Sequence, residues 1–310
     1  MKTQTISIVI RALNEAKHLP NLLSGISEQS IQPDEVILVD SGSTDRTIEI
    51  ASEYGTSLVY IQPEDFTFGR SLNVGCEYAG GDILVFVSAH VYPSDKFWLE
   101  KLTSPFVQNP ELGLVYGRQI GDERSAFSET EMMRQWFPVA RNTSQEHPFC
   151  NNANCAIRRR LWEQNKYDET ITGLEDMAWA KWALQSGHRI WYEPDSIIVH
   201  VHEETRKQIV NRYMREAIAH KKIFGQQKLN ILEAVGLFFA NVFRDYLAAV
   251  PRKKLKKNLL AIPTFRFAQF KGAWLGFRQD SEPTAELKKR FYYPKGFREK
   301  DLHDNEKTRM

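Results

Sequence analysis

The first part of the chain alternates between short apolar runs and longer segments in which apolar positions recur at helical spacing. Strands are predicted at 5–10, 35–40, 57–62, 82–87 and 113–118, and helices at 15–29, 44–54, 69–79 and 94–108. This alternation is typical of a mostly parallel sheet with helices on both faces. The sequence therefore predicts an α/β fold. The almost continuously apolar run 82–87 is expected to be a central strand, covered on both faces.

The pattern changes after residue 118. Residues 119–150 show no periodicity and contain Gly121, Pro138 and Pro148, which favours a long lid or binding loop. Further elements are expected at 151–158, at 175–186 (a helix), at 189–193 and 196–201 (two strands) and at 203–224 (a helix).

A different kind of segment follows, in which apolar residues recur at helical spacing before a basic cluster at 252–257. The apolar positions are Leu232, Val235, Phe239, Val242, Phe243, Tyr246, Leu247 and Val250. An apolar stripe beside lysines suits a membrane surface with anionic lipid. The alternatives are a helix that packs on its own domain or on a second copy of the chain, so an oligomer stays open. We predict two domains, an α/β domain at 1–225 and a helical, basic extension at 226–310.

The charge distribution supports this division. Residues 251–310 hold 16 Lys and Arg against 7 Asp and Glu, a net of +9, whereas the other 250 residues hold 25 against 32, a net of −7. A basic tail on an acidic body indicates either an anionic partner or a solvated end. We expect no nucleic-acid partner.

The sequence also bears on the compartment. It contains no run of about 18 apolar residues and no signal-peptide pattern at the N-terminus. The three cysteines, Cys76, Cys150 and Cys155, are expected to be free thiols in a reducing environment. We therefore expect a cytoplasmic protein, peripheral at the inner face of the membrane if the tail binds lipid.

Two consecutive predicted strands end in polar residues. Residues 11–15 follow the first strand, and the Asp-Ser-Gly-Ser-Thr-Asp segment 40–45 follows the second. Ligands of open α/β sheets bind beyond the carboxyl ends of the strands, so a binding site is predicted at this edge. Asp40 and Asp45 are also of the residue types that cap helices, which is the alternative role for them.

Five segments, in this order, resemble the motifs of inverting family-two glycosyltransferases with the GT-A fold. They are residues 6–15, 36–47, 69–75, 81–90 and 173–180, and the resemblance covers about 5–225. It implies a GT-A-type mostly parallel central sheet flanked by helices. It also implies a nucleotide-diphosphate sugar as donor and a hydroxyl of a glycan or lipid-linked glycan as acceptor.

The resemblance assigns residues to the donor. These are Arg11, Asn14, Glu15, Asp40, Ser43, Arg70, Asn73, Ser88 and His90. Asp40 would accept a hydrogen bond from the base, and Arg70 would offer positive charge to the phosphates. The alternative role for Asn73 is to join two loops of the protein.

Ser88-Ala89-His90 departs from the family, which usually has Asp-x-Asp at this position to hold a divalent cation. Mg²⁺ or Mn²⁺ as cofactor is therefore uncertain from the sequence, since both acids are missing. His90 and His202 are predicted to form a two-imidazole metal site, because Val199-His200-Val201-His202 is expected to be a strand that places both of its histidines on one face. The alternative is a metal-free site, in which His90, Arg11 and Arg70 neutralise the diphosphate.

Glu175 and Asp176 begin a predicted helix, where the helix dipole favours the ionised form of both carboxylates. An inverting transfer needs a carboxylate to take the proton from the acceptor hydroxyl. The resemblance assigns the role of this base to Asp176. Glu175 would orient or contact the acceptor. The acceptor side is further expected to include Asn151, Asn152, Asn154 and either Trp136 or Trp179.

Two other functions are considered. A sugar nucleotidyltransferase would need a glycine-rich phosphate loop after the first strand, which residues 11–15 do not provide. A catalytically silent nucleotide-sugar-binding protein would explain the degenerate metal motif, but Glu175 and Asp176 argue against it. The segments 88–90 and 116–119 are similar to those of rhamnosyltransferases, although the sequence leaves the sugar open.

Overall fold

The computed structural model describes residues 4–225, 228–280 and 282–292 and divides the chain into two compact units. The first unit contains residues up to 122, 133–170 and 175–201. The second contains 123–132, 171–174 and the chain from 202 onward. The two units are defined by their compactness and do not test the predicted domain boundary. The boundary after residue 225 therefore stays a prediction.

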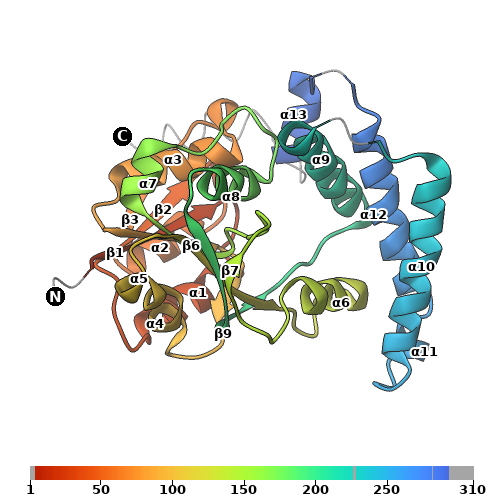
Figure 1. Ribbon diagram of the computed structural model, residues 1–310, viewed down its shortest axis with the longest axis horizontal. Helices are drawn as coiled ribbons and strands as arrows, with labels where there is room; N and C mark the ends of the chain where they lie inside the picture. Colours follow the sequence, from red (N-terminus) through yellow and green to blue (C-terminus); the bar gives the residue numbers. More distant parts are fainter. Residues whose placement is uncertain (1–3, 226–227, 281, 293–310) are drawn as a thin grey trace. The chain divides into compact units, whose positions relative to one another are not determined.

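A sheet forms the centre of the first unit, with strand order β3-β2-β1-β4-β8-β6-β9-β5 and β7 paired with β9 (Figure 1). The strands are β1 (Ile6–Ala12), β2 (Glu35–Asp40), β3 (Ser57–Tyr60), β4 (Ile83–Ser88), β5 (Val91–Pro93), β6 (Leu112–Ile120), β7 (Asn142–Gln145), β8 (Asn154–Arg158) and β9 (Arg189–His200). The pairings among β3, β2, β1 and β4 are parallel, whereas β8 runs antiparallel to both β4 and β6.

Helices cover both faces of this sheet, which confirms the predicted α/β fold. One face packs on α1 (Leu19–Ser27), α2 (Thr47–Glu53), α4 (Trp98–Thr103) and α5 (Pro105–Gln108). The other packs on α3 (Phe68–Tyr78), α7 (Arg159–Gln164) and α8 (Glu175–Gln185). The alternation along β1 follows from strand geometry, since Ile8 and Ile10 enter the first core and Val9 the second.

Strand register brings the polar strand ends together. β1 lies between β2 and β4, with Ala12 opposite Asp40 and Arg11 opposite Ser88. The predicted binding edge is therefore a feature of the sheet, and its polar residues come from three adjacent strands.

Several sequence predictions were wrong in detail. The supposed loop 119–150 contains α6 (Phe127–Trp136) and β7. In α6 the apolar residues Phe127, Met132, Met133 and Trp136 are interrupted by the polar run 128–131, so they do not recur at a regular helical spacing. The two strands expected at 189–201 are the single strand β9, which has an irregular register between Glu193 and Ile197 opposite Gly117 and Arg118.

Helices make up the described part of the second unit beyond residue 205. They are α9 (Arg206–Phe224), α10 (Ile231–Ala249), α11 (Leu255–Asn258), α12 (Ala261–Phe277) and α13 (Ala285–Tyr292). α12 lies in the extension that was predicted to be helical, although its bounds were not predicted, and it packs along α9 and α10 (Figure 1). Gly272 permits the close approach to α9, since a Cβ there would lie 2.4 Å from the carbonyl oxygen of Val210. None of the helices in the described ranges combines the length and apolarity needed to cross a bilayer.

A buried ion pair holds α10 to α12. Arg266 donates from Nε and Nη2 to the two carboxylate oxygens of Asp245, at 2.7 and 2.8 Å, and both side chains are almost fully buried. Arg266→Met is expected to lower the free energy of unfolding by about 3–5 kcal/mol, because the Asp245 carboxylate would stay buried without a cation. Urea denaturation measures this. The double variant Arg266→Met, Asp245→Leu should recover most of the loss, and a double variant as unstable as the single one would contradict this account.

Candidate active site

The loops that follow β1 and β2 are held together by Asn14. Its backbone has a φ of 55°, and its Oδ1 accepts hydrogen bonds from the N–H groups of Thr44 at 2.8 Å and Asp45 at 3.3 Å. The N–H of Asn14 in turn donates to Oγ of Ser43 at 2.9 Å. Left-handed backbone at a residue other than glycine costs free energy, and such residues cluster at functional sites.

Asp40 closes the turn at the end of β2. Its carboxylate is 1% exposed and accepts from the N–H groups of Gly42 at 3.0 Å and Ser43 at 3.1 Å. Gly42 has a φ of 101°, which favours glycine at this point of the turn. The N–H of Thr47, the first residue of α2, donates to Asp45 at 3.0 Å, so Asp45 and not Asp40 has the capping role at this helix.

Arg11 connects the end of β1 with the start of α8. Its Nη1 donates to Oε1 of Glu175 at 2.9 Å and to the carbonyl oxygen of Phe68 at 3.1 Å, and the guanidinium lies over the Phe68 ring. Glu175 is 5% exposed, so a buried carboxylate has a direct cationic partner. Leu174, just before it, has a φ of 57°.

Asp176 is buried beside Glu175. Its carboxylate accepts from the N–H groups of Asn152 at 3.0 Å and Met177 at 2.8 Å. Burial and the neighbouring Glu175 charge raise the pKa of Asp176 to about 7, although those two N–H groups and Arg11 oppose the shift. The expectation that the helix start keeps this carboxylate readily ionised was therefore wrong, because burial outweighs the helix terminus.

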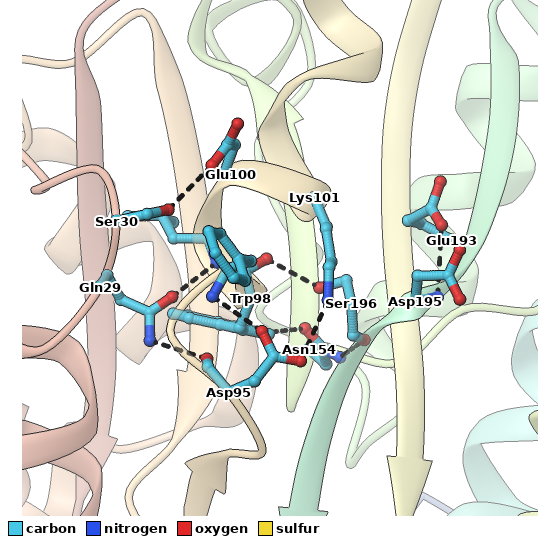
Figure 2. A network of polar contacts seen from close by, with 12 residues as sticks. Gln29, Ser30, Asp95, Trp98, Glu100, Lys101, Asn154, Glu193, Asp195 and Ser196 are labelled. Atoms are coloured by element: carbon cyan, nitrogen blue, oxygen red, sulfur yellow. Dashed lines mark hydrogen bonds and ion pairs between the residues drawn. The ribbon is translucent and has the colours of Figure 1, made fainter.

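The three asparagines of 151–154 differ in their surroundings. Asn154 is fully buried, accepts from the Trp98 indole N–H and donates to the carbonyl oxygen of Ser196, so it belongs to a core network (Figure 2). Asn152 places its backbone N–H on Asp176, and its buried Nδ2 has no hydrogen-bond partner in the described chain. Asn151 accepts from the N–H of Ala153. Asn152 thus contacts Asp176 through its backbone, and its side-chain Nδ2 is left as a buried donor without a partner among the described residues.

His90 follows the turn after β4 and lies in the first unit with His200. The pairing of β5 with β9 holds their rings 5.0 Å apart between centroids. Nδ1 of His90 contacts Oε1 of Glu15 at 3.0 Å, and Nδ1 of His200 contacts Oε1 of Gln119 at 2.7 Å. An acceptor at Nδ1 places the hydrogen of a neutral imidazole there, so that Nε2 carries the lone pair.

His202 lies outside β9, which ends at His200, and it belongs to the second unit. The strand expected to place His200 and His202 on one face was therefore wrong. Nδ1 of His202 contacts Oε1 of Glu129 at 2.6 Å, and Arg212 donates to the same oxygen at 2.7 Å. Although burial opposes it, the charges of Arg212 and His202 lower the pKa of Glu129 to about 2. The two-imidazole site of His90 and His202 stays a prediction.

The remaining residues that were predicted to bind the nucleotide-sugar donor differ in how far their side chains are already used within the protein. Asn73 donates to the carbonyl oxygen of Tyr167 and to Glu169, and it accepts from Trp162 and from the N–H of Tyr167. Its amide is thus used fully within the protein, which supports the loop-joining alternative. Arg70 is exposed on the first turn of α3, with Glu169 at 3.8 Å, and Ser88 ends β4.

An open cavity of about 300 Å³ lies in the first unit, and its lining includes Phe149, which shortly precedes the asparagines of 151–154 in the sequence. Its walls include Tyr116, Trp136, His147, Phe149 and Tyr192. Trp136 is 45% exposed, whereas Trp179 is 2% exposed and donates to the carbonyl oxygen of Asn165. Of the two tryptophans considered for sugar stacking, only Trp136 is accessible.

Comparison with known proteins identifies the family. The model for glycosyl transferase family 2 matches residues 7–165, just over half of the chain. The chain belongs to glycosyl transferase family 2. This glycosyltransferase is 25% identical over 228 residues to "O-antigen chain rhamnosyltransferase RfbN" of Salmonella typhimurium, covering 69% of this chain and 72% of that protein. It is 28% identical to "O-antigen chain rhamnosyltransferase WbaN" of Salmonella anatum, covering 62% and 64%.

Solved structures resemble the glycosyltransferase in fold. A mannosyltransferase from Pyrobaculum calidifontis, in complex with GDP-Man and Mn²⁺, aligns with a TM-score of 0.60 at 18% identity over 96% of this chain and 89% of that one. Residues 1–349 of TarS from S. aureus, in complex with UDP, align with a TM-score of 0.54 at 15% identity over 95% and 93%.

The geometry of the glycosyltransferase is compatible with a cation held by imidazoles. His90 and His200 each present Nε2 as the lone-pair nitrogen, and metal-binding histidines commonly have the other ring nitrogen on a carboxylate or amide. His202 has the same arrangement with Glu129. The sequence prediction named His90 and His202 as ligands and not His200, whose ring the pairing of β5 with β9 brings beside His90.

The pKa of Asp176 can be measured directly. A ¹³C NMR titration of labelled Asp carboxyls is expected to contain one that titrates near pH 7 and is absent from Asp176→Asn. Glu175→Gln should move it to lower pH, because a neighbouring negative charge is removed. Asp195→Asn, a surface change, serves as control. An Asp176 that titrates near pH 4 would contradict the effect of burial.

Proposed function

We propose that this glycosyltransferase transfers a sugar from a nucleotide-diphosphate donor to a hydroxyl of a glycan or lipid-linked glycan, with inversion at the anomeric carbon. The observation that carries the proposal is the buried Asp176, whose pKa near 7 and neighbouring Asn152 amide suit a general base. In this reaction Asp176 takes the proton of the acceptor hydroxyl. The acceptor oxygen bonds to the anomeric carbon, whose bond to the phosphate oxygen breaks, and a nucleoside diphosphate leaves.

The donor is proposed to lie along the joined ends of β1, β2 and β4. Asp40 and Ser43 would contact the base and ribose, together with Asn14 and Glu15. The diphosphate would lie toward Ser88, His90 and the two arginines, Arg11 and Arg70. The strand register supports this placement, since it brings Arg11 opposite Ser88 and Ala12 opposite Asp40.

The acceptor is proposed to approach from the side of Asn152. The aromatic cavity supports this, because Phe149 in its wall is only three residues from Asn152 along the chain. Aromatic faces such as that of Trp136 suit sugar rings. Glu175, held by Arg11, would orient the acceptor. The names of the two Salmonella relatives support a deoxyhexose such as rhamnose as the transferred sugar and an O-antigen type of polysaccharide as product.

His90 and His202 are proposed to hold a divalent cation, Mn²⁺ or Mg²⁺, with His200 as an additional candidate ligand. When bound, the cation would neutralise negative charge on the diphosphate. Glu15 and Glu129 would orient the imidazoles through Nδ1.

We further propose that the protein works in the cytoplasm at an anionic membrane surface, where a lipid-linked acceptor would be presented. The cationic segment 252–257 and the exposed apolar side chains of α10 support this. The silent-protein alternative is less favoured, because a structural role does not require two adjacent buried carboxylates.

The first test concerns the base. Asp176→Asn is expected to lower kcat by roughly 10²–10⁴-fold while nucleoside diphosphate still binds, since the proton acceptor alone is lost. In the unmodified protein kcat/KM should rise with pH and level off above about 7, because Asp176 must be ionised to accept the proton. Transfer and donor hydrolysis are measured with a panel of nucleotide sugars, and Asp195→Asn is the control. Near-normal turnover by Asp176→Asn would rule out this base.

The second test concerns the cation. Removal of divalent ions with EDTA is expected to abolish transfer, and Mn²⁺ or Mg²⁺ should restore it. His90→Gln should weaken the restoration, because a carboxamide is a poorer ligand than imidazole. Thermal shift gives a second readout, in which the stabilisation by a nucleoside diphosphate should increase with Mn²⁺ in the unmodified protein and not in His90→Gln. Full activity in EDTA would favour the metal-free alternative.

A further inference from the structure

Helix α10 exposes a continuous apolar face. Six large apolar residues at spacings of three or four along the helix are between 44% and 80% exposed: Leu232, Val235, Phe239, Phe243, Leu247 and Val250. The buried side of the same helix is a different arc, which contains Ala234, Val242 and Ala249. The stripe predicted from the sequence therefore combines two faces, of which only one is used by the core of the second unit.

A groove between α10 and α12 opens onto this face. It has a volume of about 440 Å³, and its walls include Ile231, Val235, Phe238, Phe239, Phe267 and Trp274. Lys271 is the charged residue in its lining. The groove is therefore suited to a hydrocarbon chain whose polar end lies near an ammonium group.

A second cavity adjoins the groove and is cationic. It has a volume of about 760 Å³, shares Phe238, Phe267 and Lys271 with the groove, and adds Arg206 and Lys207 from the first turn of α9. These three cations are exposed, and Nζ of Lys271 lies over the Phe267 ring, 5.9 Å from its centroid. An apolar slot that leads into a cationic pocket matches the two ends of an anionic lipid.

We propose that the α10–α12 groove binds an anionic phospholipid of a bilayer, with an acyl chain in the groove and the phosphate at Arg206, Lys207 and Lys271. The remaining exposed apolar residues of α10 would insert among neighbouring lipids, at the depth of the headgroups. This inference rests on the membrane-surface part of the proposed function and names the site that achieves it.

Charge favours a bilayer over a second copy of the chain as the occupant. Cations lie beside the apolar face at two places: Lys253, Lys254, Lys256 and Lys257 follow the C-terminal end of α10 and are exposed, and Arg206, Lys207 and Lys271 line the pocket that includes Phe238. Leu259 and Leu260 extend the apolar surface beside these lysines, at 52% and 79% exposed. Two copies joined through this face would bring like charges together, whereas an anionic bilayer offers the opposite charge over the whole area.

Flotation of the full chain with liposomes tests the surface as a whole. Binding is expected with phosphatidylglycerol in phosphatidylcholine vesicles, to be much weaker with phosphatidylcholine alone, and to fall as salt rises. Arg206→Glu, Lys207→Glu and Lys271→Glu should each lower the partition coefficient by about fivefold or more. Lys96→Glu, an exposed lysine of the first unit, is the matched control.

The apolar part is tested by Phe239→Asp with Phe243→Asp, both more than 60% exposed. This double variant should lose binding to anionic vesicles, whereas Tyr78→Asp, at 67% exposed in the first unit, should keep it. Circular dichroism verifies that each variant is folded. A protein that sediments as a dimer, ignores anionic vesicles and becomes monomeric in the double variant would overturn the proposal in favour of a second copy.

Trp274 reports on the groove itself. Vesicles with dibrominated acyl chains are expected to quench part of the tryptophan fluorescence, and Trp274→Phe should remove that part while vesicle binding continues. Quenching that Trp274→Phe leaves unchanged would overturn the placement of an acyl chain in the groove. Calorimetry with nucleoside diphosphates separates the two proposals: the lipid-site variants should bind nucleotide normally, so failure of lipid binding alone leaves the transferase proposal standing.

Discussion

The ion pair between Arg11 and Glu175 joins parts of the site that are 164 residues apart in sequence. The same guanidinium donates to the carbonyl oxygen of Phe68, where α3 begins. One side chain therefore ties the end of β1 to the starts of α3 and α8, three segments that carry family motifs. An ion pair this buried gains little net stability, since desolvation offsets its attraction. Its importance is positional and electrostatic, because it supplies the cation beside two adjacent buried acids.

Three histidines of this glycosyltransferase are likewise held in fixed orientations by side-chain contacts at Nδ1. In the first unit, Glu15 and Gln119 contact Nδ1 of His90 and His200, and in the second unit Glu129 contacts Nδ1 of His202. Compared with the Asp-x-Asp motif of the family, Ser88 and His90 leave two fewer negative charges at this edge of the sheet. A diphosphate bound there, as proposed, would need less positive charge to offset it.

Local patterns were sufficient to predict the βα units and the meeting of polar strand ends at one edge of the sheet, because buried parallel strands are nearly continuous apolar runs that end in polar turns. They failed for elements whose formation or packing depends on tertiary contacts. The apolar residues of α6 do not recur at a regular helical spacing, three-residue β5 is too short to detect, and the close fit of α12 to α9 depends on Gly272. At the site, the family resemblance assigned the role of base to Asp176, which stays a prediction. Its raised pKa was not predictable, because it depends on burial and on an N–H donated by Asn152, 24 residues earlier.

The burial of Asp176 decides how strong a base it is. An aspartate has an ordinary pKa of 3.8, and a pKa of about 7 corresponds to roughly a thousandfold greater proton affinity. A weaker base would be ionised at neutral pH but would gain little by accepting a hydroxyl proton, and a stronger one would already be protonated. The N–H groups of Asn152 and Met177 stabilise the carboxylate and limit the rise. Asn152 thus holds the carboxylate through its backbone N–H, while its buried side-chain Nδ2 has no hydrogen-bond partner in the described chain.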